Sequence, residues 1–304
     1  MEKNWEMWMR ECVLCPRECK VNRLEGRIGY CKVSGKIKAA RAALHFWEEP
    51  CISGERGSGA VFFSGCSMGC VFCQNEGISH GKTGKTITIE RLADIFLQLQ
   101  DEQKAHNINL VTPTHYVPQI AEALEKAKER GLEIPVVYNS SGYEKPETLH
   151  RMEGLVDIYL PDFKYMDGEI AKKYSRAEDY SFWAKQALAE MVRQVSEAEF
   201  DEDGMMRKGV IVRHLLLPGC RRDSKAVLRY LAETYGNKIF ISLMNQYTPM
   251  PGIEKYPELS RKITKREYEW MIEYALDLGI ENGFIQEGDT AKESFIPPFD
   301  GEGV

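Results

Sequence analysis

The sequence of 304 residues is long enough for one large domain, alone or with a small appendage. Its 43% hydrophobic residues supply a substantial core, and its 28% charged residues suit a soluble surface. The net charge of −6 argues against a general nucleic-acid-binding protein, which normally presents a basic face.

The sequence also predicts a cellular compartment. Residues 1–10 contain acidic side chains and lack the apolar stretch of a signal peptide, and no apolar run is as long as a membrane span. The nine cysteines are grouped in a way that indicates metal ligation in a reducing compartment rather than disulfides. We therefore expect a cytoplasmic protein that binds neither nucleic acid nor membranes.

Residues 1–50 form a predicted Cys-rich N-terminal unit with the spacing C-x2-C-x3-C-x11-C. Its ligands would be Cys12, Cys15, Cys19 and Cys31. Four thiolates fit structural Zn²⁺ or a second, fully ligated [4Fe–4S] cluster, and ligand type alone does not separate the two. The alternative is that these thiols are reduced and buried. Because so short a unit has little apolar core, we expect a metal to stabilise it. Cys51 and Cys220 are interpreted as core or loop thiols, although Cys51 is an alternative fourth ligand.

A second cysteine motif follows an apolar run over 60–63. Cys66, Cys70 and Cys73 have the spacing C-x3-C-x2-C, with glycines around them. A [4Fe–4S] cluster normally takes four thiolates, so three would leave one iron open for chemistry. Three buried cysteines that meet by chance are the alternative, because free cysteine is often buried.

From residue 59 onward, short apolar runs alternate with stretches of helical period, which is typical of βαβ units and a parallel sheet. A strand or packed hairpin over 37–47 precedes them. The predicted strands are 60–64, 107–112, 135–139, 155–160, 210–217 and 238–244, with a further edge strand over 283–286. The predicted helices begin after Thr88, cover 117–130 and 184–195, and run from a Thr264–Glu267 capping box to Leu278. This order predicts an α/β fold, a partial (β/α)6 TIM-like barrel over 51–290, followed by a C-terminal tail over 291–304 that either lies across the barrel or frays.

The Cys66-x3-Cys70-x-Phe72-Cys73 segment resembles the cluster motif of the radical S-adenosylmethionine (SAM) superfamily. The resemblance covers roughly residues 55–290. It implies a [4Fe–4S] cluster whose open iron is chelated by SAM, and reductive cleavage of SAM to a 5′-deoxyadenosyl radical that abstracts hydrogen. It implies no catalytic residue beyond the cluster ligands.

In such architectures, ligands bind where the strands end, so the resemblance implies a SAM site at those positions. Asp162-Phe163-Lys164 resembles a segment of the activating enzymes for pyruvate formate-lyase, and Arg213 begins a stretch similar to Arg-x4-Pro-Gly of the same family. A neighbouring carboxylate is the structural alternative for Arg213, and His115 is either a proton donor or substrate contact or a satisfied helix-start residue. The implied SAM contacts are Thr112, Thr114, Asn139, Ser141, Asp162, Lys164, Arg213, Gln246 and Thr248.

The resemblance favours a radical SAM enzyme similar to glycyl-radical-enzyme activases. It implies flavodoxin or ferredoxin as electron donor and a glycyl radical enzyme or another protein as substrate. One alternative is a radical SAM maturase that acts on another protein, a peptide or a small molecule. The alternative from a different class is a non-catalytic Fe–S or Zn interaction protein.

Overall fold

The computed structural model describes residues 4–286 and 296–304. A sheet dominates this part of the chain, with the strand order β10-β9-β8-β6-β5-β4-β2-β1-β3 and with β7 paired to β8. The strands from β2 to β10 along this path are parallel, whereas β1, β3 and β7 are antiparallel additions. The bounds are β1 Lys38–His45, β2 Ser58–Phe63, β3 Lys85–Thr86, β4 Ile108–Val111, β5 Val136–Ser140, β6 Ile158–Pro161, β7 Glu199–Phe200, β8 Met206–Leu215, β9 Phe240–Met244 and β10 Gly283–Ile285.

The seven parallel strands confirm the predicted α/β fold, and their ends differ from the predicted ones by at most four residues. The sheet is open, because β10 and β3 form its two edges, as in a partial barrel. It takes in the end of the predicted N-terminal unit, since β1 pairs with β2 from Ala39 opposite Phe63 to His45 opposite Ser58.

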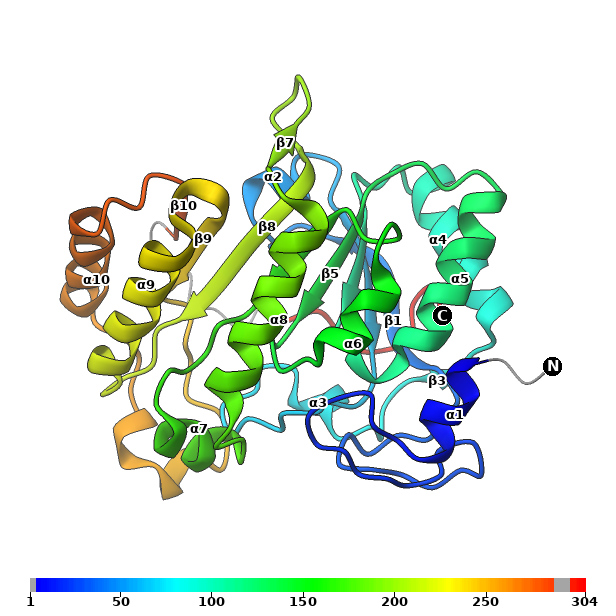
Figure 1. Ribbon diagram of the computed structural model, residues 1–304, viewed down its shortest axis with the longest axis horizontal. Coiled ribbons are helices and arrows are strands. Elements are labelled where there is room, and N and C mark those ends of the chain that lie inside the picture. Colours follow the sequence, from blue (N-terminus) through cyan, green and yellow to red (C-terminus); the bar gives the residue numbers. More distant parts are fainter. Residues whose placement is uncertain (1–3, 287–295) are drawn as a thin grey trace.

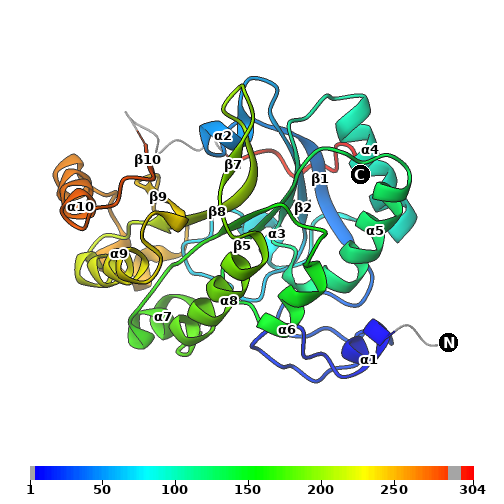
Figure 2. The same ribbon diagram turned by 45° about the horizontal axis from the view of Figure 1, so that its top comes forward.

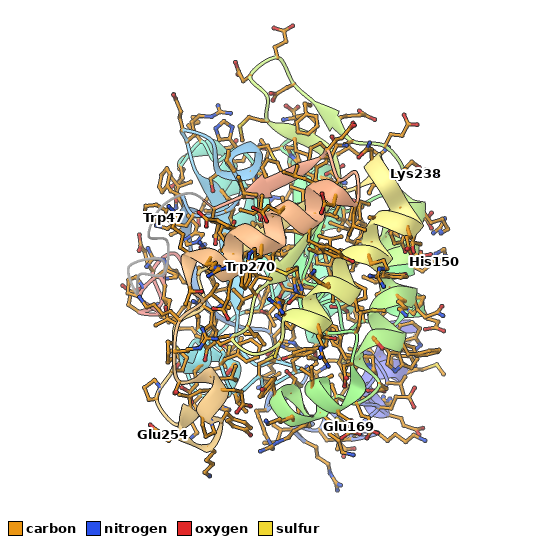
Figure 3. The ribbon with its side chains drawn as sticks, turned by 90° about the vertical axis from the view of Figure 1, so that its left-hand side faces the viewer. Trp47, His150, Glu169, Lys238, Glu254 and Trp270 are labelled. Atoms are coloured by element: carbon orange, nitrogen blue, oxygen red, sulfur yellow. The ribbon has the colours of Figure 1, made fainter. Side chains whose placement is uncertain are left out.

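Helices cover one face of this sheet. Figure 1 shows α5, α8 and α9 in front of the strands, and Figure 2 shows the same layer with the top of the molecule turned forward. At one side, α9 and α10 pack side by side, with Trp270 on the outer helix (Figure 3). The α-helices are α1 Asn4–Arg10, α2 Pro50–Ser53, α3 Glu76–Ser79, α4 Ile89–Asp101, α5 Val117–Glu129, α6 Pro146–Leu149, α7 Gly168–Ser175, α8 Tyr180–Val195, α9 Arg221–Tyr235 and α10 Lys265–Asp277. The 3₁₀ helices are Thr114–Tyr116, His150–Met152, Gly236–Lys238, Ile253–Lys255 and Pro257–Leu259.

The helix signals in the sequence have physical counterparts. Thr88 Oγ1 accepts a hydrogen bond from the Arg91 N–H at 3.1 Å and begins α4. Thr264 and Glu267 form the predicted capping box of α10. The prediction omitted α9, whose Val227, Leu228 and Leu231 are buried among many charged residues and which has no side-chain N-cap.

The C-terminal residues 296–304 lie along β1. The Ala42 N–H donates to the Glu302 carbonyl at 2.9 Å, and Arg41 forms an ion pair with Asp300. Phe299 packs its ring against Phe62. This part of the predicted tail is therefore bound to the sheet, while Ser294 and Phe295 lie outside the described residues. Within the described chain, no helix has the length and apolarity needed to cross a membrane.

Candidate functional site

A cavity of about 320 Å³ lies between the cysteine loop and the segment that follows β1. Its cysteine side is next to α3, and its other side is next to α2, for which Glu49 is the N-cap residue. Figure 1 places α2 and α3 at opposite ends of the sheet. The cavity therefore extends along the inside of the partial barrel. Its polar and sulfur-bearing lining residues are His45, Glu48, Glu49, Cys66, Met68, Cys70, Cys73, Gln74, Asn75, Ser79, Thr112, Asn139, Ser140, Ser141, Asp162, Lys164, Arg213, Ser242, Met244, Gln246 and Gln286.

The three cysteines of the C-x3-C-x2-C motif face this cavity together. Cys66, Cys70 and Cys73 are half-buried and all line it. Burial and the two neighbouring thiols raise the pKa of Cys73 to about 12, so its thiolate needs compensation by a positive charge or a metal. The Met68 N–H donates to Cys66 Sγ at 3.3 Å, and the Ser175 hydroxyl donates to Cys70 Sγ at 3.0 Å. Both sulfurs are thus held as hydrogen-bond acceptors.

The N-terminal unit holds this loop in place. Arg17 Nε donates to the Ser67 carbonyl at 2.8 Å, and its NH2 group donates to the Ser175 carbonyl at 3.0 Å. The Cys66 N–H donates to the Cys31 carbonyl at 3.3 Å. Gly65 precedes this contact at φ +94°, and a Cβ there would lie 2.6 Å from the same carbonyl oxygen. Only glycine fits at this position.

The four N-terminal cysteines are neighbours. Burial raises the pKa of the Cys15 thiol, and Cys31, Cys12 and Cys19 add to this effect through their charges. The Tyr30 N–H donates to Cys19 Sγ at 3.1 Å. Within residues 4–286 and 296–304, no three His, Cys, Asp or Glu side chains are arranged to hold a single metal ion. The thiolates of a [4Fe–4S] cluster bind different irons and therefore stand farther apart than the ligands of one ion.

Asp162 and Lys164 form an ion pair at the end of β6. Lys164 Nζ lies 2.5 Å from Asp162 Oδ2. Burial alone would lower the pKa of Lys164, but Asp162 and Cys70 raise it above its ordinary value. Tyr180 of α8 fixes this turn, because its hydroxyl accepts from the Lys164 N–H at 2.9 Å and lies 2.8 Å from the Ser141 carbonyl. A charged pair is thus presented to the cavity beside the cysteines.

Arg213 is engaged by two carboxylates from the segment after β1. Its Nε donates to Glu49 Oε1 at 2.9 Å, and its NH2 group contacts both Glu49 Oε2, at 2.6 Å, and Glu48. Although burial alone would raise the pKa of Glu49, Arg213 holds it below its ordinary value. The structural alternative for Arg213, a neighbouring carboxylate, is therefore the arrangement observed.

Most of the implied SAM contacts meet at the cavity, and two do not. Thr112, Asn139, Ser141, Asp162, Lys164, Arg213 and Gln246 line it, whereas Thr114 and Thr248 do not. The Thr114 hydroxyl instead donates to Glu144 Oε1 at 2.6 Å inside the core. His115 is also buried away from the cavity, with Nε2 2.8 Å from the Ser64 carbonyl oxygen, which agrees with the structural interpretation of this residue.

The family model of the radical SAM superfamily matches residues 60–231, which is more than half of the chain. The chain belongs to the radical SAM superfamily. Over 285 residues it is 30% identical to an uncharacterized protein, MJ0674, of Methanocaldococcus jannaschii, covering 88% of this chain and 76% of that protein.

Solved structures of this superfamily share the fold. Methylornithine synthase (PylB) matches with a TM-score of 0.50 and 16% identity, covering 72% of this chain and 60% of that one. SuiB of Streptococcus suis bound to S-adenosylmethionine matches with a TM-score of 0.51 and 13% identity, covering 73% of this chain and 48% of that one. HydG, a maturase of the [FeFe]-hydrogenase, matches with a TM-score of 0.51 and 14% identity, covering 76% of this chain and 52% of that one. The chain thus spans about half to three-fifths of these proteins.

Membership of the radical SAM superfamily implies a [4Fe–4S] cluster and SAM, and the site fits both. Three thiols face one cavity, and two of them accept hydrogen bonds, Cys66 from the Met68 N–H within the motif and Cys70 from the Ser175 hydroxyl outside it. The lining beside them carries the oppositely charged Asp162 and Lys164, which complement the ammonium and carboxylate of an amino acid.

Sequence reasoning missed several residues of this site. Glu48 and Glu49 were passed over because they precede a proline in an apparent turn, although a charged Arg213 within an apolar strand signals a buried partner. Arg17 and Tyr180 left no such signal. Their roles depend on which loops the fold brings together.

Proposed function

We propose that this radical SAM protein is an enzyme that reductively cleaves SAM and abstracts a hydrogen atom from a partner protein, in the manner of a glycyl-radical-enzyme activase. The observation that carries the proposal is the single cavity that contains Cys66, Cys70 and Cys73 together with the Asp162–Lys164 pair. When bound and reduced, a cluster at these thiolates supplies the electron that splits SAM into methionine and a 5′-deoxyadenosyl radical. The resemblance of Asp162-Phe163-Lys164 to the activase segment supports the choice of a protein substrate.

In this proposal the protein itself binds SAM, orients it towards the substrate and excludes water from the cavity. Lys164 holds the SAM carboxylate, and Asp162 holds Lys164 in place through their 2.5 Å contact. Thr112, Ser141 and Gln246 offer hydrogen-bonding groups to the rest of SAM. Flavodoxin or ferredoxin is the proposed electron donor.

The test is anaerobic reconstitution with iron and sulfide, reduction, and measurement of 5′-deoxyadenosine formed from SAM. Cys66→Ala, Cys70→Ala and Cys73→Ala should each abolish product. Cys220→Ala is the matched control, because this buried thiol does not line the cavity, and it should retain turnover. Full turnover in any of the three motif variants, or none in the native protein, would refute the proposal. A maturase remains the outcome if product forms but no glycyl radical enzyme is activated.

The N-terminal cysteines carry a second proposal, that they hold a second [4Fe–4S] cluster which stabilises residues 1–50, because the described thiols are not arranged to hold a single ion; Zn²⁺ is the alternative. The mutual influence of Cys12, Cys15, Cys19 and Cys31 supports it, and so does the contact of Cys31 with the cluster loop. Metal analysis of a Cys66/Cys70/Cys73 triple alanine variant decides between the two candidates. One equivalent of zinc supports Zn²⁺, and residual iron and sulfide support a second cluster. If the variant contains neither zinc nor iron, the proposal is refuted.

A further inference from the structure

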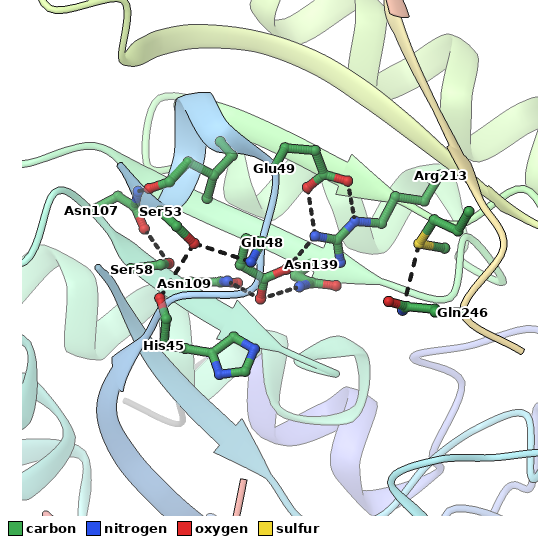
Figure 4. A network of polar contacts seen from close by, with 12 residues as sticks. His45, Glu48, Glu49, Ser53, Ser58, Asn107, Asn109, Asn139, Arg213 and Gln246 are labelled. Carbon is green, nitrogen blue, oxygen red and sulfur yellow. Dashed lines mark hydrogen bonds and ion pairs between the residues drawn. The ribbon is translucent and has the colours of Figure 1, made fainter. Parts of the chain in front are cut away.

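The end of the cavity next to α2 carries more negative than positive charge. The guanidinium of Arg213 is already matched by Glu49, which binds it through both carboxylate oxygens at 2.9 and 2.6 Å (Figure 4). Such a two-point pair is the preferred geometry for these groups and balances one charge against one. Glu48 reaches the same guanidinium and is left as the surplus carboxylate.

The other partners of Glu48 are neutral. Its Oε1 accepts from Asn109 Nδ2 at 2.9 Å and, more weakly, from Asn139 Nδ2 at 3.5 Å. The Asn109 side chain is fully buried, and its Oδ1 has no hydrogen-bond partner in the structure. The Glu48 side chain is 7% exposed, so water provides little screening. An ionised carboxylate at such a position is costly unless a cation joins it.

No cation among the described lining residues remains to offset Glu48. These residues include three carboxylates, Glu48, Glu49 and Asp162, and two permanent cations, Arg213 and Lys164. Lys164 is paired with Asp162. His45 also lines the cavity, but burial holds its pKa below the ordinary value despite the nearby Glu48, so its ring is neutral at pH 7.

The surplus charge lies on the α2 side of the cavity, and Arg213, which it contacts, is the β-bridge partner of Asp162. Glu48 and Glu49 lead into α2, whereas the three cysteines lead into α3, at the opposite end of the sheet. With the SAM carboxylate assigned to Lys164, a cationic group at Glu48 is assigned to a second molecule, and the SAM affinity of Glu48→Gln tests this assignment.

We propose that Glu48, supported by Asn109 and Asn139, is a subsite for a cationic group of the substrate, an ammonium or guanidinium such as a lysine or arginine side chain. This inference rests on the proposed SAM site and narrows the substrate to one that carries a positive charge. Arg213 and Glu49 act as positioning residues, because their pair holds the surplus carboxylate in the cavity.

The test is calorimetric titration of the reconstituted holoprotein, saturated with SAM and without reductant. N-acetyl-arginine amide and N-acetyl-lysine amide are the cationic probes, and N-acetyl-citrulline amide is the neutral probe of nearly equal shape. We expect the native protein to bind at least one cationic probe on the order of tenfold more tightly than the citrulline compound. Glu48→Gln should reduce that preference to about twofold or less. Glu55→Gln, at an exposed glutamate, is the matched control and should keep the native preference for cationic probes.

Equal affinity for cationic and neutral probes, or binding of neither, would overturn the inference. A Glu48→Gln variant that keeps the preference for cationic probes would also overturn it. If that variant loses only SAM affinity, the Glu48 carboxylate serves SAM and not the substrate, which likewise overturns the inference. If Glu48→Gln does not fold, Glu48→Asp replaces it and should weaken only the cationic probes. An unchanged preference in that variant counts against the subsite. Because no turnover is measured, failure of SAM cleavage would leave these results intact and refute the proposed function alone.

Discussion

Arg17, from the Cys-rich N-terminal unit, donates a hydrogen bond of 2.8 Å to the carbonyl oxygen of Ser67, inside the C-x3-C-x2-C loop. The same guanidinium reaches the carbonyl oxygens of Ser175 and Arg176 at the end of α7 and stacks 3.9 Å from the centre of the Tyr30 ring. One side chain therefore ties the N-terminal unit, the cysteine loop and α7 together. The N-terminal unit thus contacts the cysteine loop through Arg17 as well as through the Cys31 carbonyl.

Arg17→Met should loosen the cysteine loop. Removing the guanidinium leaves several carbonyl oxygens without a charged donor, which costs roughly 2–3 kcal/mol of folding free energy. We expect a lower free energy of unfolding in denaturant titrations and faster loss of the loop-bound cluster absorbance to a chelator. Arg27→Met is the control, because this arginine is exposed in the same segment. Equal chelation rates in both variants would contradict the role of Arg17.

Ser175→Ala should make the cluster harder to reduce. The Ser175 hydroxyl donates to Cys70 Sγ at 3.0 Å and is in turn 2.8 Å from the Tyr165 hydroxyl. Hydrogen bonds to cluster sulfurs stabilise the reduced, more negative state. A net hydrogen bond of about 1 kcal/mol corresponds to roughly 40 mV for one electron, so the potential should fall by about that amount in an electron paramagnetic resonance redox titration. Tyr165→Phe should give a smaller shift of the same sign, and an unchanged potential in Ser175→Ala would exclude this effect.

Local patterns were sufficient to predict most of the sheet and the cysteine loop. The strand Val136–Ser140, for example, begins with two valines and a buried tyrosine directly after Pro135, and this short β-branched and aromatic run identifies it as a strand. By contrast, α9 lacks a capping side chain and carries charged residues through most of its length, so its buried Val227 and Leu231 did not stand out. Its place in the fold comes from packing against α10 and from the burial of Val227, Leu228 and Leu231 in the core.

The same distinction applies to the site. Asp162 and Lys164 are two residues apart, so their pairing at a strand end is a local property. Arg213 and Glu49 are 164 positions apart, and their contact exists only after β1 and β8 have been placed in one sheet. Thr114 lies in the core and not in the cavity, because its hydroxyl donates a hydrogen bond to Glu144, thirty positions later in the chain.

Lys164→Gln should weaken SAM binding without removing the cluster. The substitution removes the cation proposed to hold the SAM carboxylate and leaves Asp162 unpaired, which repels that carboxylate. A charge-assisted hydrogen bond is worth about 1.5–3 kcal/mol, so the dissociation constant of SAM should rise about tenfold or more. Calorimetry on the anaerobic holoprotein measures it. Lys172→Gln, on the exposed side of α7 and paired with Glu178, is the control. Affinity within twofold of the native value would argue against a carboxylate contact.

Glu144 should make the fold less stable as the pH rises towards 7. It is fully buried, and burial raises its pKa to about 7 despite hydrogen bonds from Thr114, Ser140 and Tyr138. In the unfolded chain the pKa is near 4.5, so between these values the folded state binds a proton that the unfolded state has released. This contribution is absent below pH 4.5, accumulates through pH 5–7 and reaches a cost of about 3 kcal/mol above pH 7. Glu144→Gln removes the titration, so its free energy of unfolding should fall less than that of the native protein between pH 5 and 8 in urea titrations. Parallel pH profiles for the two proteins would show that Glu144 does not titrate in this window.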